Sequence, residues 1–370
     1  MLAPTYTIPP LPPTVELETV AILKALNAAS RALADLKGQA RTIPNQGILI
    51  DTLALQEAKA SSEVENIVTT QDELFQADLF PDDPQSPASK EVALYRDALR
   101  LGYARIHETD GLIPNSALID MFRLLKGRED GFRVTPGTAL KHDRTGAIVY
   151  VPPQDARDIV THMTALERFI NDDSVSALDP LIKMALIHHQ FESIHPFPDG
   201  NGRIGRILNV LYLTRTGLLD IPVLYLSRHI TRQKADYYRL LQAVRDSDGA
   251  QEAWQEWIIY MLQGVADTAA TTLQIVEGIR DQMGRTKHRM RAELPKLYSQ
   301  ELLNNLFRHP YTRIEYVQRD LGLKARQTAA KYLDTLAEHQ FVVKQRAGKH
   351  NYYINAELVR LFLDVSEEAE

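Results

Sequence analysis

The sequence of 370 residues contains no cysteine. Disulfide bonds, thiolate zinc sites and a cysteine nucleophile are therefore excluded. Basic residues are not in excess either, because 42 Lys and Arg stand against 48 Asp and Glu, which gives a net charge of −6. This balance gives no overall indication of nucleic-acid binding, so any such binding would have to be local. The lack of cysteine fits a reducing cytoplasm.

Long apolar runs are also missing, and no uninterrupted stretch approaches the length of a membrane span. Residues 1–13 are rich in proline and lack the basic and apolar regions of a secretory signal peptide. We therefore expect a cytoplasmic protein that makes no contact with a membrane. The hydrophobic content of 44% is ordinary for a globular protein, and the chain length suggests two or three domains.

Apolar residues at helical spacing occur along most of the chain, which favours a mainly α protein. Helices are expected over residues 15–40, 48–70, 90–108, 115–126, 155–171, 181–191, 226–246 and 254–273. A further polar, basic helix is expected over residues 278–296, leading out of the core.

The most informative stretch runs from Ile194 to Arg206, between two apolar segments that are typical of buried helices. The first helix should end near Pro196, because the residue before a proline disfavours the α conformation. The second helix should begin within the loop and continue through residues 207–213. The sequence therefore predicts a helix, a short polar loop and a second helix.

Two glycines and two arginines in this loop predict a site for phosphate groups. Gly200 and Gly202 carry no Cβ, so the backbone can turn tightly and approach a ligand closely. Amides at a helix N-terminus attract an anion, because their N–H groups and the positive end of the helix dipole face it. Arg203 and Arg206, three residues apart, should share one face, where their forked donors can bind phosphate oxygens.

Two titratable residues complete the loop. Asp199 can hold a divalent cation through oxygen, as Mg²⁺ beside phosphates requires. His195 suits a general base that takes a proton from an attacking hydroxyl. Taken singly, a Gly-Asn-Gly turn, an arginine near a helix start and a histidine beside prolines are usually structural. Their combination in this order favours a functional site, with Phe197 as a buried anchor.

Residues 195–206 resemble the Fic family signature, His-x-Phe-x-(Asp/Glu)-Gly-Asn-Gly-Arg-x-x-Arg, at every fixed position. The resemblance implies an enzyme that moves AMP from ATP onto a Ser, Thr or Tyr hydroxyl of a protein. The phosphorylating Doc branch of the family lacks the Gly-Asn-Gly-Arg form, so its presence here favours nucleotidyl transfer.

The same resemblance implies a role for each loop residue. His195 would be the base, and Asp199 would bind Mg²⁺. Asn201 and the amides of the glycines would hold the α-phosphate. Arg203 and Arg206 would hold the β- and γ-phosphates, so ATP and Mg²⁺ are the expected ligands.

A second segment, N-terminal to the loop, resembles the inhibitory helix of Fic proteins, (Ser/Thr)-x-x-x-Glu-(Gly/Asn). Ser61, Glu65 and Asn66 match it. In a helix, Ser61 and Glu65 would lie one turn apart on the same face. The resemblance implies that Glu65 pairs with Arg206 at the γ-phosphate position, so that ATP is excluded or held with its α-phosphate wrongly aimed. Without the resemblance, Glu65 would be a solvated side chain of an amphipathic helix.

Residues 133–153 predict a β-hairpin with a polar turn at 142–146. Its second strand carries the apolar residues Ile148, Val149, Tyr150 and Val151. A hairpin at this distance before the loop resembles the family's flap, which aligns a target peptide by strand addition. The alternative is a small ribbon that only covers the core.

One pair of adjacent tyrosines and one pair of adjacent histidines could each have a functional role. Tyr237 and Tyr238 could stack on the adenine, although paired aromatics at helical spacing are at least as often core residues. His188 and His189 could suggest a metal site. We favour a structural role for the histidines, because adjacent residues of a helix point in different directions.

The C-terminal segment resembles a winged helix-turn-helix. Three short helices are expected over residues 299–307, 313–321 and 325–338, followed by a hairpin over 341–354 that turns at 347–349. The third helix would enter a DNA major groove. Basic residues fall on the expected recognition helix and wing: Lys324, Arg326, Lys331, Lys344, Arg346, Lys349 and His350. Winged helices also serve in protein docking and dimerisation, so both roles stay open.

We therefore expect a mainly α protein with a Fic-type helical core, a small β-hairpin flap and a C-terminal winged helix-turn-helix. The expected domains are an N-terminal regulatory region (1–85), a catalytic core (86–275), a linking helix (276–298) and the winged helix (299–370).

The expected function is that of a protein adenylyltransferase restrained by Glu65. Its partners would be a target protein, the chain itself through self-modification and, through the winged helix, DNA. The oligomeric state stays open, with a homodimer among the alternatives. Two other functions compete: removal of AMP from a modified protein, with Glu65 orienting water, and a DNA-binding regulator whose core only senses nucleotide. The intact His195 argues against the second, since a sensor has no need of a base.

Overall fold

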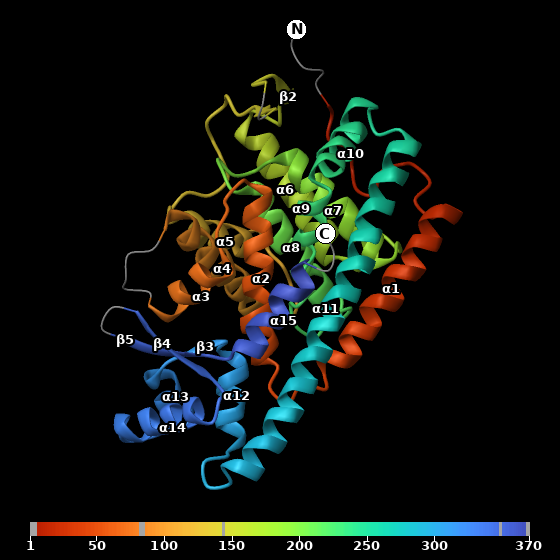
Figure 1. The fold of residues 1–370 in the computed structure, drawn as a ribbon. Helices are drawn as coiled ribbons and strands as arrows, with labels where there is room; N and C mark the ends of the chain where they lie inside the picture. The colour runs from red at the N-terminus through yellow and green to blue at the C-terminus, as the bar shows by residue number, and fades with distance from the viewer. Residues whose placement is uncertain (1–5, 81–85, 143–144, 348–349, 368–370) are drawn as a thin grey trace. The chain divides into compact units, whose positions relative to one another are not determined.

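The computed structural model describes residues 6–80, 86–142, 145–347 and 350–367 (Figure 1). Helices make up most of these residues, and the strands form a sheet of β1 and β2 and a sheet in the order β3-β5-β4. The expected mainly α fold is confirmed. Within the described ranges, no helix is both long and apolar enough to cross a membrane.

The first helices in chain order are α1 (Val20–Ala40), α2 (Gly47–Val64), α3 (Gln71–Leu79), α4 (Pro87–Glu108), α5 (Asn115–Lys126), α6 (Ala156–Asn171), α7 (Pro180–Ile194) and α8 (Asn201–Arg215). The others are α9 (Ser227–Arg232), α10 (Lys234–Asp246), α11 (Gln251–Glu293), α12 (Gln300–Arg308), α13 (Ile314–Asp320), α14 (Arg326–Glu338) and α15 (Ala356–Glu367). The strands are β1 (Leu140–Lys141), β2 (Ile148–Tyr150), β3 (Tyr311–Thr312), β4 (Val343–Ala347) and β5 (His350–Ile354), and a short 3-10 turn, η1, covers Asp173–Val175.

The helices depart from the sequence predictions in four places, one of which is α15, a helix that the sequence interpretation missed entirely. The helix expected over 48–70 ends at Val64, and the separate helix α3 follows, which the sequence interpretation missed. Thr70 starts α3 with a capping box, because its side chain accepts from the Glu73 amide while the Glu73 side chain accepts from the Thr70 amide. The helix expected over 226–246 is divided at Gln233 into α9 and α10. The two helices expected over 254–296 are one continuous helix, α11.

The chain divides into two compact units that are not contiguous in sequence. The first comprises Met1–Ala34, Glu57–Val68 and Leu94–Ala269, and the second comprises Asp35–Gln56, Thr69–Ala93 and Ala270–Glu370. This division differs from the four contiguous domains expected from the sequence, because α2, α4 and α11 each supply residues to both units. The proline-rich boundary expected near residues 81–87 lies outside the described residues for 81–85.

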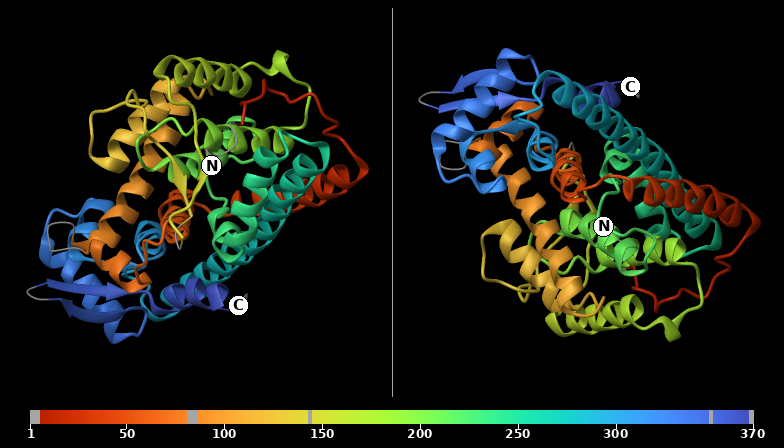
Figure 2. Two further views of the ribbon diagram at one scale, coloured as in Figure 1. Left: turned by 90° about the horizontal axis from the view of Figure 1, so that it is seen from above. Right: turned by 90° about the horizontal axis from the view of Figure 1, so that it is seen from below.

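In the first unit, α7 and α8 form the centre of the helical core (Figures 1 and 2). Residues 181–194 of α7 are all buried, and apolar residues lie on every side of the helix among buried polar ones such as His188 and Glu192. The pair is antiparallel, because His188 near the middle of α7 hydrogen-bonds Asn209 of α8 while Glu192 lies against Gly205. Trp254 and Trp257 of α11 are fully buried, and Trp257 Nε1 donates to the Ala185 carbonyl at 2.9 Å.

The second unit contains α12, α13 and α14 with the sheet β3-β5-β4, drawn in blue in Figures 1 and 2. Strands β4 and β5 pair antiparallel from Val343 opposite Ile354 to Ala347 opposite His350. Strand β3 pairs with the other edge of β5, with Tyr311 opposite Ile354. The three helices and the hairpin lie where the sequence predicts them, although residues 348–349 of the expected turn, with Lys349, lie outside the described residues.

Candidate functional site

The loop between α7 and α8 is held by its backbone conformation and by a buried phenylalanine. His195 caps α7 in the left-handed region with φ 49° and ψ 59°, and its amide donates to the Phe191 carbonyl at 2.9 Å. Gly200 starts α8 with φ 75°, a conformation that favours glycine. Phe197 is buried and stacks on Phe122 with 4.4 Å between ring centroids. Phe197 is therefore the anchor that the sequence predicted.

Asn201 stabilises the turn from within. Its Oδ1 accepts from the Phe197 amide at 2.8 Å, and its Nδ2 donates to the Phe197 carbonyl at 2.7 Å. Both ends of this buried amide group are therefore used to fix the loop backbone. The contact with an α-phosphate that the resemblance implies for Asn201 stays a prediction.

His195 lies in a positively charged environment. The Nε atom of Arg133 donates to the His195 carbonyl at 2.8 Å, and another nitrogen of the same guanidinium donates to the Pro153 carbonyl. Burial, followed by the positive charges of Arg245 and Arg133, lowers the pKa of His195 to about 3. The imidazole is therefore neutral at physiological pH. Its Nδ1 has no hydrogen-bond partner among the described residues.

Asp199 is exposed at the rim of the loop and pairs with a lysine that the sequence interpretation missed. The Nζ atom of Lys126, at the end of α5, lies 2.6 Å from Asp199 Oδ2. Burial acts to raise the pKa of Asp199, but the hydrogen bond and charge of Lys126 outweigh it and leave the pKa below its usual value. Asp199 is thus ionised, and its role as a metal ligand stays a prediction. No cluster of three or more metal-binding side chains occurs in the described part of the chain, so a cation here would need oxygens from a ligand as well.

Arg206 is the most enclosed charged residue of the site. Its side chain is 1% exposed, and its Nε donates to Ser61 Oγ at 2.8 Å. Its Nη2 donates to the Ser61 carbonyl at 2.9 Å and to Glu65 Oε1 at 2.7 Å. Burial would lower the pKa of Arg206, but the charge of Glu65 keeps it above its usual value. The predicted pairing of Glu65 with Arg206 is therefore present in the structure.

The Glu65 carboxylate also covers the start of α8. A Cβ atom added to Gly202 would lie 2.5 Å from Glu65 Oε1 and 3.0 Å from Arg206 Nη1. A side chain at 202 would therefore push the Glu65 carboxylate aside, so glycine at this position allows the close approach of Glu65. The first turn of a helix leaves N–H groups without intrahelical acceptors, and here a carboxylate stands over them. The predicted anion site thus already holds an anionic group.

Glu65 and Asn66 lie beyond the end of their helix, contrary to the expected helix over 48–70. After Val64 the chain makes a tight turn, with the Ile67 amide donating to the Ser62 carbonyl at 3.0 Å. Asn66 adopts the left-handed region with φ 61°, which asparagine tolerates better than most residues. Its Oδ1 accepts from Lys234 Nζ at 2.8 Å. The turn thereby aims Glu65 at Arg206.

A buried glutamate that the sequence interpretation missed anchors the helix carrying Ser61. Glu57, one turn before Ser61, accepts from the Ser227 amide at 3.0 Å, from the Ser227 hydroxyl and from Tyr95 Oη at 3.1 Å. Burial raises the pKa of Glu57 to about 7, although these hydrogen bonds oppose the shift. Its sequence position, four residues before Ser61, is the one signal that could have identified it.

The predicted hairpin is present and short. Leu140 of β1 pairs with Tyr150 of β2, and a bulge shifts the register next to that pair. Ile148 and Val149 are exposed, as a strand that receives a peptide would require. Tyr150 is buried instead, and its hydroxyl donates to the Ser193 carbonyl at 2.8 Å.

Tyr150 therefore anchors the flap, and Val151 lies just after the strand, half-buried. Residues 143–144 of the expected turn lie outside the described residues. Arg245 of α10 secures the base of the flap, with its guanidinium 4.1 Å from the Tyr150 ring centroid. Arg133 and Arg245 reach the loop from distant parts of the sequence, and nothing in the local pattern indicated them.

The aromatic and histidine pairs are mostly part of the core. Tyr237 is 1% exposed and its hydroxyl lies 2.9 Å from His188 Nε2, which argues against stacking on an adenine. Tyr238 is 44% exposed, so the same role stays a prediction for it alone. His188 and His189 contact different partners, since His189 Nε2 lies 3.3 Å from the Leu241 carbonyl. The two histidines thus have the separate structural contacts that their adjacency predicts.

Three family models match successive parts of the chain. Residues 23–104 match the Fic/DOC family N-terminal region, and residues 116–213 match the Fic/DOC family domain. Residues 282–358 match the C-terminal domain of SoFic-like protein adenylyltransferases. The loop and its flanking helices α7 and α8 lie within the second of these segments.

Curated relatives match the central part of the chain. The chain is 28% identical over 131 residues to the Protein adenylyltransferase Fic of Drosophila erecta, and it is 33% identical over 99 residues to that of Drosophila melanogaster. These matches cover 35% and 27% of this chain. The chain spans only 24% and 19% of the lengths of the two relatives.

Solved structures share the fold over a larger part of the chain. A Fic family protein from Desulfovibrio desulfuricans G20 aligns with a TM-score of 0.55 at 20% identity, covering 91% of this chain and 96% of that one. Fic-1 from C. elegans aligns with a TM-score of 0.54 at 19% identity, covering 70% and 74%. The fold, the three successive domain matches and the complete loop signature agree, and the chain belongs to the Fic/DOC family.

Proposed function

We propose that this chain transfers AMP from ATP to a Ser, Thr or Tyr hydroxyl of a protein, itself included, and that Glu65 restrains the reaction. The observation that carries the proposal is the Glu65 carboxylate, which lies 2.7 Å from Arg206 Nη2 and stands over Gly202. Because a carboxylate lies between Arg206 and the start of α8, this position suits an anionic group, and the neutral His195 belongs to the same loop. The matched relatives named protein adenylyltransferase support the same activity.

The residues of the loop fit the chemistry. Neutral His195 would accept the proton of the target hydroxyl while the hydroxyl oxygen attacks the α-phosphorus. The bond from the α-phosphorus to its bridging oxygen would break, and pyrophosphate would leave. The amides at the start of α8, with Arg203 and Arg206, would bind the phosphate oxygens. Positioning and charge neutralisation supply most of the catalysis in such reactions.

Asp199 fits a Mg²⁺ ligand, because its pKa is low and its carboxylate is exposed at the rim of the loop. Mg²⁺ would neutralise part of the charge of the phosphates. Exposed Ile148 and Val149 of β2 would align the target peptide beside the loop.

Glu65 would restrain transfer by competing with the γ-phosphate for Arg206. The guanidinium donates three hydrogen bonds to Ser61 and Glu65, which use Nε and Nη2 and leave only the two N–H groups of Nη1 for a triphosphate. The negative charge of Glu65 would also repel the phosphates. ATP would then be excluded or held with its α-phosphorus away from the attacking hydroxyl.

Incubation with ATP labelled at the α-phosphate or at the γ-phosphate, with Mg²⁺, tests the proposal. We expect the α-label alone to appear on the protein or on a lysate protein, with the mass of AMP found by mass spectrometry. The Glu65→Gly variant should label more strongly than the wild type. Label from the γ-phosphate alone, or undiminished labelling in His195→Ala, would refute AMP transfer.

The reverse reaction is the alternative within the same site. Here Glu65 would orient a water molecule toward AMP already attached to a protein. The two activities can be distinguished with AMP-modified protein that has been prepared with the Glu65→Gly variant. Release of AMP by the wild type, and none by the variant, would favour removal of AMP over its transfer.

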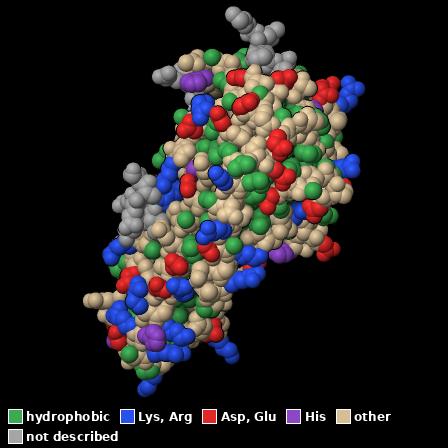
Figure 3. All heavy atoms as spheres, turned by 90° about the vertical axis from the view of Figure 1, so that its right-hand side faces the viewer, with side chains coloured by type: hydrophobic (Ala, Val, Ile, Leu, Met, Phe, Trp, Pro, Cys, Tyr) green, Lys and Arg blue, Asp and Glu red, His purple; other side chains and the backbone are tan. Residues whose placement is uncertain are grey.

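For the second unit we propose a DNA-binding role as a separate candidate. The order α12, β3, α13, α14, β4, β5 with a three-stranded sheet supports the expected winged helix-turn-helix. However, Arg326 of α14 pairs with Glu315 at 3.0 Å, and Lys344 of β4 pairs with Asp334 at 2.7 Å. Basic and acidic side chains are likewise interspersed on the face shown in Figure 3. Docking of a protein is therefore the alternative function of this unit, against which DNA binding has to be tested.

A further inference from the structure

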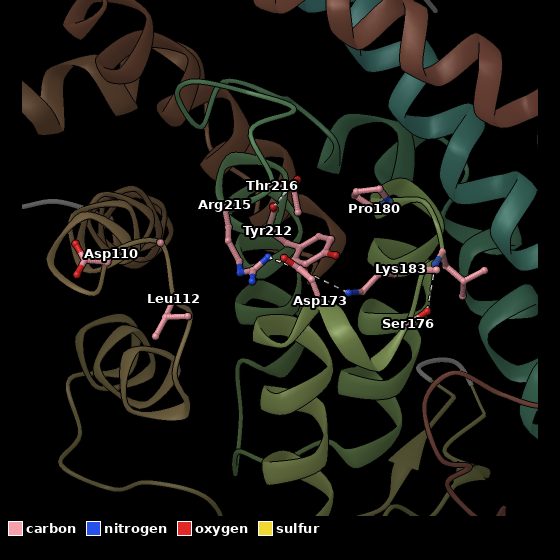
Figure 4. Close-up of a pocket in the computed structure, with 12 residues that line it drawn as sticks. Asp110, Leu112, Asp173, Ser176, Pro180, Lys183, Tyr212, Arg215 and Thr216 are labelled. Atoms are coloured by element: carbon pink, nitrogen blue, oxygen red, sulfur yellow. Dashed lines mark hydrogen bonds and ion pairs between the residues drawn. The ribbon is translucent and has the colours of Figure 1, made fainter.

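A polar cavity of about 440 Å³ lies at the opposite end of the α7–α8 pair from the loop (Figure 4). The start of α7, the end of α8, the turn η1 and the loop after α4 line it. From Lys183 in the cavity to His195 is twelve residues of helix, or about 18 Å at 1.5 Å per residue. The cavity is therefore separate from the candidate active site.

Two buried cations face this cavity. Lys183 of α7 has a side chain that is 3% exposed, and Arg215, the last residue of α8, has one that is 10% exposed. Both appear in Figure 4 with their charged ends directed at Asp173. Arg215 Nη2 donates to the Asn171 carbonyl at 2.8 Å, and its buried Nε has no partner among the described residues. Burying cations costs free energy unless counter-charges lie close by.

Asp173 provides only weak compensation for these cations. One oxygen, Oδ1, lies 3.5 Å from Arg215 Nη1 and 3.7 Å from Lys183 Nζ. Both distances exceed those of strong charge-assisted hydrogen bonds. The Asp173 side chain is 77% exposed and belongs to the short turn η1, so water competes for it. Burial lowers the pKa of Lys183, and the charge of Asp173 does not fully offset this.

We propose that this cavity binds the phosphate group of a small organic molecule, on Lys183 and Arg215, with the Asp173 carboxylate displaced. A carboxylate brings one negative charge to two cations, whereas a phosphate monoester brings close to two at neutral pH. Asp110 also lines the cavity, but its carboxylate is directed away from the two cations in Figure 4, so a phosphate matches Lys183 and Arg215 better than the Asp173 carboxylate does. Tyr212 and Leu178 line the cavity beside the cations and would contact the body of the molecule.

Titration calorimetry with inorganic phosphate, at constant ionic strength, tests the proposal on the full chain. Lys183→Met keeps the length of the buried side chain and removes its charge, so we expect phosphate to bind about tenfold more weakly or not at all. Asp173→Asn removes the competing charge, so phosphate should bind about tenfold more tightly. Arg168→Gln is the matched control, because Arg168 is exposed and pairs with the neighbouring Asp172.

The candidate active site can also attract phosphate, and the variant Arg206→Met separates the two. Binding at the cavity should persist in Arg206→Met and disappear in Lys183→Met. If AMP transfer proves absent, the cavity result still stands, because calorimetry does not depend on activity. If circular dichroism shows that Lys183→Met does not fold, the affinity of Asp173→Asn for phosphate tests the proposal instead. Tighter binding than in the wild type supports the proposal, and unchanged binding contradicts it. An affinity that neither Lys183→Met nor Asp173→Asn changes, or no binding of phosphate at all, would overturn the proposal.

Discussion

Buried cations stand at both ends of the antiparallel α7–α8 pair, but they are held very differently. At the loop end, Arg206 donates three hydrogen bonds of 2.7–2.9 Å to Ser61 and Glu65. At the other end, Lys183 and Arg215 share one exposed carboxylate oxygen of Asp173 at 3.5–3.7 Å. The same central helices thus support one tightly closed charge cluster and one loosely compensated cluster.

The difference shows how a chain can hold an anion site closed. Glu65 reaches Arg206 from the tight turn directly after α2, the helix that Glu57 anchors through three donors, so the closing carboxylate is held close to a fixed element. Asp173 reaches its cations from a three-residue turn and remains exposed. A ligand can displace the exposed Asp173 at little cost, whereas displacing Glu65, whose side chain is 34% exposed, also breaks its hydrogen bond to the buried Arg206.

The largest effect should come from the base at the loop end. His195→Ala removes the group that accepts the hydroxyl proton, so AMP transfer should fall by about 10²- to 10⁴-fold. ATP binding should remain, because other groups form the anion site. His107→Ala, on exposed α4 surface, is the matched control and should leave transfer unchanged. Near-normal transfer by His195→Ala, measured with α-labelled ATP, would contradict the mechanism.

The next effect concerns the closed cluster itself. Glu65→Gly frees Arg206 and removes the repulsion of phosphates, so self-modification should rise by about ten- to a hundredfold, the value of one or two charged hydrogen bonds. Glu65→Gly combined with Arg206→Ala should lose most of the gain, because both residues act on one site. The readout is the label retained on the protein.

Glu63→Gly is the control for this experiment. Glu63 pairs with Lys59 of the same helix at 2.8 Å and makes no contact with the loop in the described structure. Equal activation by Glu63→Gly would show that the effect arises from weakening the helix. No activation by Glu65→Gly would show that the ion pair with Arg206 does not restrain transfer.

Unfolding measurements compare the two clusters directly. Ser61→Ala leaves the buried Arg206 Nε without its acceptor, so the free energy of unfolding should fall by about 1–3 kcal/mol. Asp173→Asn weakens exposed contacts and should change it by less than about 1 kcal/mol. Urea titration followed by circular dichroism gives both values. A larger loss of unfolding free energy in Asp173→Asn than in Ser61→Ala would show that the cluster at Asp173 is the more tightly held of the two.

The pH dependence should reflect the environment of His195. Since burial, Arg245 and Arg133 lower its pKa to about 3, the base stays unprotonated and the transfer rate of Glu65→Gly should be flat from about pH 8 to pH 5. Arg245→Met removes a neighbouring positive charge, so the pKa should rise and the acid limb should move to higher pH. A half-maximal rate near the ordinary histidine pKa of about 6.5 in the parent would refute the shift.

The smallest effect is expected in the second unit. If α14 and the wing bind DNA, Arg326→Ala should weaken binding and reduce the salt slope by about one. The pairing of Arg326 with Glu315 should make the loss of affinity modest. Fluorescence anisotropy with duplex DNA at several salt concentrations measures both. A tail without salt-sensitive affinity would indicate protein docking or self-association.

Apolar spacing and short motifs were sufficient to predict most of the helices and the loop. Apolar spacing predicted α5 at the bounds the structure gives and α7 with its end before Pro196, because periodicity and proline act locally. The loop residues and the pair of Glu65 with Arg206 followed from short motifs. The predicted helix boundaries were wrong where local turns and caps fix them. A turn with Asn66 in the left-handed conformation ends α2 at Val64, and the capping box of Thr70 starts α3.

The distant residues that serve the loop could be identified only from the packing of the fold. Lys126, Arg133 and Arg245 carry no local pattern that distinguishes them from other charged residues, and Glu57 is marked only by its place one turn before Ser61. Each of the four acts over a long sequence separation. The pKa of His195 depends on charges that packing brings near it. The same packing buries Tyr237 against His188 and gathers Lys183 and Arg215 around one cavity. Electrostatics depend on distance and burial in three dimensions, which sequence spacing alone does not fix.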